Sequence, residues 1–120
     1  MKIEAIALLR DNYAWLLTDE ATGECAVVDP SEAAPVDALL VERSLKLRWI
    51  LATHHHWDHV NGIEGLLEGR DGVEVFCSSY DFEQGRIPGA TRAFGHGDSF
   101  ELWGLPVQCM SVPGHTLGAV

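Results

Sequence analysis

The sequence has little positive charge, few cysteines and no long apolar run. Eight lysines and arginines stand against eighteen aspartates and glutamates, which gives a formal net charge of −10. Nucleic-acid phosphates and anionic lipid headgroups repel a chain of this charge. The apolar run from Ile6 to Leu9 is too short for a signal sequence or a membrane span. We therefore predict neither a nucleic acid nor a membrane as a partner.

The three cysteines, Cys25, Cys77 and Cys109, are widely spaced and form no C-x-x-C pair. This spacing argues against a disulfide framework and against a cysteine-rich zinc site. Each cysteine lies in an apolar run that resembles a strand, which predicts a small buried side chain. We expect a reducing, cytoplasmic setting for the protein.

The length of 120 residues and the hydrophobic content of 47% predict one globular domain over residues 1–120. Strand and helix patterns alternate along it, with no repeat or linker. The expected elements, in chain order, are a hairpin of strands 13–18 and 25–28, a helix after Asp29-Pro30 capped by Ser31, a strand at 49–52, a helix at 63–67, a strand at 73–77, a long loop over 86–98, and a second hairpin of strands 100–102 and 106–110.

A histidine-rich heptapeptide, THHHWDH from Thr53 to His59, follows the apolar strand that ends at Ala52. In an extended segment, residues two apart point to the same side, so His54 and His56 can converge on one metal ion. Asp58 and His59 then suit a second, neighbouring ion. Imidazole and carboxylate ligands favour zinc, with iron or manganese possible. The same alternation points His55 and Trp57 away from the metals, as supporting residues.

Two other interpretations of the heptapeptide are weaker. A histidine-rich segment can be a solvated loop, but four ligand-type residues at this spacing after a strand favour a metal site. His55 and His59 stand at i and i+4, as in helical zinc proteases. The residue after His55 is His56 rather than the glutamate that serves as base there, so H-E-x-x-H is not satisfied.

A second short motif, Pro113-Gly114-His115-Thr116, follows an expected strand at 107–112. Its glycine allows a tight turn, and His115 could complete a tripod with His54 and His56. His96, between two glycines, is expected to be a loop histidine in solvent.

Both motifs resemble those of the metallo-β-lactamase superfamily. The heptapeptide is similar to its metal signature, and the segment around His115 is similar to its next histidine motif. Asp11-Asn12-Tyr13, Val28-Asp29-Pro30 and the T-H-H-H-x-D-H-V form further resemble glyoxalase II, the hydroxyacylglutathione hydrolases. The resemblance runs over nearly the whole chain but covers only the first half of that family's catalytic domain.

The resemblance implies an α+β fold, the αββα four-layer sandwich, of which this chain forms about the first half. By it, His54, His56 and His115 hold the first of two zinc ions, and Asp58 and His59 hold the second. A bridging aspartate, a last histidine ligand and the glutathione-binding side chains are expected beyond Val120. Ser31, Asn61 and Ala119 depart from the family pattern, where glycine, glycine and histidine are frequent. Asp29 has two open roles, one near the site and one as a helix cap.

The implied activity is hydrolysis of S-2-hydroxyacylglutathione, such as S-lactoylglutathione, to glutathione and a 2-hydroxy acid, a step of methylglyoxal detoxification. A bound divalent ion lowers the pKa of water from about 15.7 toward about 7, so no serine or cysteine nucleophile is needed. Asp58 is the expected catalytic residue, because it can orient the nucleophile as well as bind its ion. The alternatives are a persulfide dioxygenase with one iron, a lactonase, a β-lactamase, or a non-catalytic metal-binding fragment.

Overall fold

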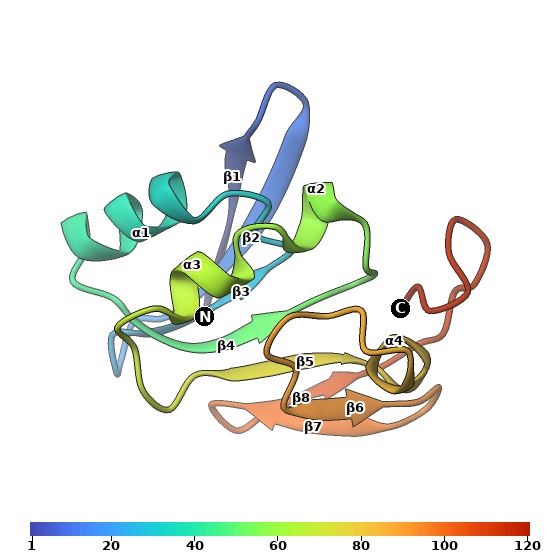
Figure 1. Cartoon of the computed structure of the whole chain (residues 1–120). Helices are drawn as coiled ribbons and strands as arrows, with labels where there is room; N and C mark the ends of the chain where they lie inside the picture. Colours follow the sequence, from blue (N-terminus) through green and yellow to red (C-terminus); the bar gives the residue numbers. More distant parts are fainter.

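The computed structural model describes residues 1–120 as two sheets with helices packed beside the larger one (Figure 1). The larger sheet has six strands in the order β1-β2-β3-β4-β5-β6, and the smaller one pairs β7 with β8. The strands are β1 Lys2–Leu8, β2 Asn12–Asp19, β3 Glu24–Val28, β4 Lys46–Leu51, β5 Glu74–Ser78, β6 Arg92–Phe94, β7 Ser99–Leu102 and β8 Leu105–Gln108. The helices are α1 Ala33–Glu42, α2 Trp57–Val60, α3 Ile63–Leu67 and α4 Ser79–Glu83.

The order of pairing in the larger sheet brings several strand ends to one edge. β1, β2 and β3 pair antiparallel, whereas β3, β4, β5 and β6 pair parallel. The carboxyl ends of β3, β4 and β5 therefore lie at the same edge, and the start of β2 lies there too, because Trp15 pairs with Val28. Ligand sites in sheets with parallel strands typically form at such an edge.

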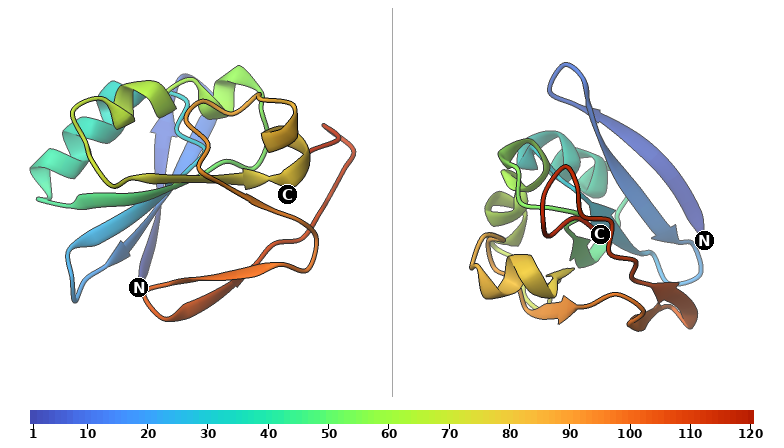
Figure 2. Two further views of the ribbon diagram at one scale, coloured as in Figure 1. Left: turned by 60° about the horizontal axis from the view of Figure 1, so that its bottom comes forward. Right: turned by 90° about the vertical axis from the view of Figure 1, so that its right-hand side faces the viewer.

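The layers correspond to part of the predicted four-layer sandwich. Helices α1 and α3 lie over one face of the larger sheet, and the β7–β8 hairpin lies across the opposite face (Figure 2). The core between helices and sheet includes Val36 and Leu40 of α1, Ile63 and Leu66 of α3, and Ile50 of β4. The α+β prediction is confirmed, with one helical layer and two sheet layers present in this chain.

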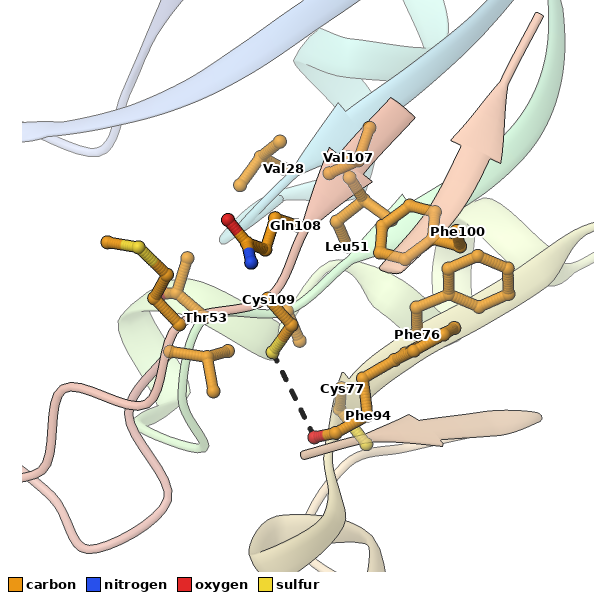
Figure 3. Close-up of a pocket in the computed structure, with 13 residues that line it drawn as sticks. Val28, Leu51, Thr53, Phe76, Cys77, Phe94, Phe100, Val107, Gln108 and Cys109 are labelled. Carbon is orange, nitrogen blue, oxygen red and sulfur yellow. Dashed lines mark hydrogen bonds between the residues drawn. The ribbon is translucent and has the colours of Figure 1, made fainter. Parts of the chain in front are cut away.

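The face toward the hairpin is less completely covered. A cavity of about 170 Å³ lies between the two sheets, next to the packed rings of Phe76, Phe94 and Phe100 (Figure 3). Cys109 lies beside it and its thiol donates weakly to the carbonyl of Phe94 at 3.9 Å. Farther along the sheet, Trp15 is 45% exposed.

All three cysteines are free, and Cys25 and Cys77 are buried as expected, whereas Cys109 is half-buried. Burial raises the pKa of the Cys25 thiol to about 12 and that of Cys77 to about 11. None of the helices has the length and apolar character needed to cross a membrane.

Both predicted hairpins are present, and the two-residue turn of the second has positive φ at Trp103 and Gly104. Several other local predictions were wrong. Strand β1 was not predicted, and β6 forms within the expected loop 86–98. Ser31 is buried and does not cap α1, whose N-cap is Glu32 without a side-chain bond. The last expected strand ends at Gln108, so His115 follows an extended loop instead.

Candidate metal centre

Three of the five predicted ligands come together in one group, His54, His56 and His115. Their ligand nitrogens all lie within 4.8 Å of one another. The ring centroids are 4.6 to 5.1 Å apart, and the rings stand nearly perpendicular to one another. His54 is buried, His56 is half-buried and His115 is exposed, so the group opens from the core to solvent. This tripod of nitrogens could hold a metal ion.

A second group shares His54 with the first. Its members are Asp29, His54 and His59, and their ligand atoms also lie within 4.8 Å of one another. The rings of His54 and His59 are 4.2 Å apart at their centroids. Asp29 directly follows β3 and His59 lies in α2, so parallel pairing of β3 with β4 brings together residues 30 positions apart.

Hydrogen bonds fix which nitrogen of His54 is available. The hydroxyl of Thr53 donates to the Asp29 carboxylate, which can only accept. Since this uses the one hydroxyl proton, Thr53 must accept from Nδ1–H of His54, 2.9 Å away. Nε2 of His54 therefore carries the lone pair, and it is buried without a hydrogen-bond partner. A metal ion would satisfy this atom, so the residues present fit the cofactor that the family implies.

Asp29 organises this edge of the sheet. It has a left-handed backbone, with φ of 53°. Its Oδ1 accepts from the Thr53 backbone at 2.7 Å, and its Oδ2 lies 3.0 Å from Nδ1 of His59. This last contact leaves Nε2 of His59 free for another partner. Of the two roles left open for Asp29, the contacts support the one near the site.

Asp58 lies outside both groups, although it is close to the second one. Its Oδ2 is 3.7 Å from Nε2 of His59. The side-chain amide of Asn12 donates to this oxygen at 3.2 Å and to the Asp58 carbonyl at 2.7 Å. The Asn12 hydrogen bond is the main reason that the pKa of Asp58 lies below its usual value. Sequence reasoning used Asn12 only as a family marker and missed this contact, which joins residues 46 positions apart.

Burial is the main cause that lowers the pKa of His54, and the neighbouring histidines, His59 first, lower it further. The neutral imidazole, which is the form that binds metals, is therefore favoured.

The remaining histidines lie where they were expected, outside both groups. Nδ1 of His55 faces away toward Asp81 at 3.5 Å, and Trp57 is 66% exposed. His96 is an exposed loop residue, and its Nδ1 accepts from the Ser111 backbone at 3.0 Å.

The comparisons with known proteins agree with this geometry. The chain matches the family model described as "Metallo-beta-lactamase superfamily" over residues 8–117. The chain belongs to this superfamily. Among its curated relatives is "Hydroxyacylglutathione hydrolase" of Gloeobacter violaceus, 44% identical over 120 residues, which cover 100% of this chain and 47% of that protein. The chain spans about half the length of the curated relatives it matches.

Solved structures of metallo-β-lactamase type share the fold. The BLEG-1 B3 metallo-beta-lactamase superposes with a TM-score of 0.84 over 98% of this chain and 65% of its own, at 19% identity. ETHE1 from Myxococcus xanthus superposes with a TM-score of 0.79 over 99% of this chain and 52% of its own, at 28% identity. The chain thus holds part of a metallo-β-lactamase domain, and this fold implies metal binding.

Proposed function

We propose that this chain is the metal-binding part of a thioester hydrolase that cleaves S-2-hydroxyacylglutathione, such as S-lactoylglutathione. The observation that carries the proposal is the alignment of the whole chain, both donor groups included, with relatives named hydroxyacylglutathione hydrolase. The products are glutathione and a 2-hydroxy acid. Three free thiols suit a reducing, cytoplasmic location.

In this proposal His54, His56 and His115 hold the first zinc ion, and Asp58 and His59 contribute to the second. The partnerless Nε2 of His54 and the closeness of Asp58 to His59 support this assignment. Asp29 contacts Nδ1 of His59 and so leaves Nε2 of that ring on the side of Asp58. Iron and manganese use similar ligands, so the zinc assignment is tested by metal analysis of the purified protein.

The metals supply a Lewis acid and a water of lowered pKa. The side chains of this protein hold and orient the reacting groups. Asn12 donates to Oδ2 of Asp58 and fixes this carboxylate, so it can accept a hydrogen bond from the attacking water and orient it toward the thioester carbonyl. The thiol that leaves has an ordinary pKa of about 8.5 and departs as a thiolate, so no strong general acid is required. Side chains that hold the glutathione carboxylates are expected in the part of the relatives beyond this chain.

The test uses the natural gene product, a panel of S-lactoylglutathione, glutathione persulfide and a β-lactam, and the His56→Ala variant as its control. We expect the thioester to be the preferred substrate and His56→Ala to abolish its turnover. Oxygen consumption with the persulfide that exceeds thioester turnover would favour the dioxygenase alternative. The 120-residue chain alone is expected to be a poor catalyst, because five side chains supply few donors for two ions.

A further inference from the structure

Asp81 is a deeply buried carboxylate that belongs to neither donor group. It is 1% exposed and lies in α4, directly after β5. Its backbone is fixed, because its N–H donates to Oγ of Ser78 at 3.1 Å. Both of its carboxylate oxygens are buried without a hydrogen-bond partner. A buried carboxylate in this condition is costly, so a neighbouring group must compensate it.

Two neighbours contact this carboxylate, and each belongs to a segment that carries proposed ligands. Nδ1 of His55 lies 3.5 Å from Oδ1 of Asp81, and His55 stands between His54 and His56 in the chain. On the other side, a Cβ at Gly118 would collide with both carboxylate oxygens of Asp81. Gly118 therefore rests directly on the carboxylate, three residues after His115.

The segment 111–120, which we call the His115 segment, buries Thr116, Gly118 and Ala119 and makes two hydrogen bonds to the rest of the chain, one at each end. Val120 donates to the carbonyl of Thr53 at 3.0 Å, and Ser111 donates to His96 at 3.0 Å. Residues 111–115 are all exposed. The contact of Gly118 with Asp81 is one of the buried contacts of this segment, and it lies three residues from His115.

We propose that Asp81 is a positioning residue of the metal centre, which accepts a hydrogen bond from His55 and seats Gly118, and so sets His115 against His54 and His56. A shift of about 0.5 Å brings His55 to ordinary hydrogen-bond distance. The inference rests on the proposed ligands. Side chains that hold metal ligands in place, without binding the metal themselves, typically change the affinity of the protein for the metal by about 10- to 100-fold when they are removed.

The first experiment compares Asp81→Asn and Gly118→Ala with two matched controls in the natural gene product. Asp71→Asn removes an exposed carboxylate, and Gly114→Ala adds a Cβ to the same segment where nothing lies within 4 Å. Zinc affinity is measured by competition with a chromophoric chelator, and the Co²⁺ absorption spectrum reports ligand geometry. We expect Asp81→Asn and Gly118→Ala to weaken zinc binding about 10- to 100-fold and to alter the Co²⁺ spectrum, and the controls to match the wild type.

A second comparison separates positioning from a general loss of folding. In an Asp81→Ala background the atoms that crowd Gly118 are absent, so adding Gly118→Ala should cause no further loss of zinc affinity. His55→Ala, at a half-buried position, should by itself weaken zinc binding and alter the Co²⁺ spectrum, even where an Asp81 variant fails to fold.

Wild-type zinc affinity and Co²⁺ spectrum in Asp81→Asn or in His55→Ala would overturn this inference alone. If zinc binding by the wild type did not depend on His54, the proposed ligands would be overturned, and this inference with them.

Discussion

The two donor groups are equally compact but differ in how their atoms are already used. In the group of His54, His56 and His115, the buried Nε2 of His54 has no partner. In the group of Asp29, His54 and His59, the Asp29 carboxylate already engages Thr53 twice and His59 once. Three of the roughly four acceptor positions of that carboxylate are thus occupied.

This difference separates ligands from the residues that orient them. By distance alone, Asp29 and His54 would both count as candidate metal ligands. The hydrogen bonds show that Asp29 instead supports the ring of His59 and the loop at Thr53. This difference supports the proposal that the first group holds the first ion and that Asp58, rather than Asp29, joins His59 at the second. Substitutions that act on one group and spare the other test this interpretation.

The largest effect is expected from the shared residue. His54→Ala should remove the first ion, because His54 is one of its three proposed ligands, and should weaken the second, because its ring packs against that of His59. Metal content per protein, measured by mass spectrometry, should fall to less than half of the wild-type content. Asp71→Ala, at an exposed position before the start of β5 and away from both groups, should retain the wild-type content. Full metal content in His54→Ala would contradict the assignment of this ligand.

A smaller, selective effect is expected from the unshared histidines. His115→Ala should lose the first ion and keep the second, and His59→Ala should do the reverse, because each residue belongs to one group only. Stepwise zinc titration of the natural gene product would resolve the two ions. Equal loss of both ions in both variants would show that the two groups form a single cooperative site.

Much of this arrangement could be predicted from local patterns. The spacing of His54 and His56 and the turn chemistry of both hairpins each depend on neighbouring residues, and the structure shows these features. Strand β1 was missed because its alternation includes alanines, which are weak strand formers. Strand β6 was missed because it has only three residues and one neighbour, β5.

The support of the site could not be predicted in this way. Asp29 reaches His59 only because β3 pairs in parallel with β4, and Asn12 reaches Asp58 only because β2 starts at the same edge. Such contacts between distant residues depend on strand order and register, which a single sequence does not specify. The motif around His115 was found from its residues and its place after an expected strand, and from its resemblance to a family, whereas the contact of this segment with Asp81 required the structure.

Asp29→Asn should weaken the second ion more than the first. An asparagine keeps an oxygen for the Thr53 backbone, but its amide nitrogen can accept neither from Nδ1–H of His59 nor from the Thr53 hydroxyl. The Thr53 hydroxyl can still accept from Nδ1–H of His54, whereas His59 loses its partner. Loss of that partner should reduce affinity for the second ion about 10- to 100-fold. The same zinc titration measures it, with Asp71→Asn as an exposed control. Equal weakening of both ions would show that Asp29 holds the whole loop rather than one ring.

The smallest effect is expected from Asn12→Ala, and it should depend on pH. The Asn12 amide lowers the pKa of Asp58, so the folded state holds this carboxyl ionised more readily than the unfolded chain does. Such a group contributes stability above its unfolded pKa, about 3.9, and that contribution is lost as the pH falls through the lower folded value. Asn12→Ala removes the main cause of the shift, so the Asp58 pKa should rise, as a carboxyl-carbon NMR titration of the metal-free protein would measure. At neutral pH Asp58 stays ionised in both proteins, and zinc affinity should differ little, whereas near the ordinary pKa of an aspartate, about 3.9, the variant should hold more of Asp58 in the protonated form. An unchanged Asp58 titration in Asn12→Ala would show that another group holds this carboxylate, and that the contact between Asn12 and Asp58 positions only the backbone of α2.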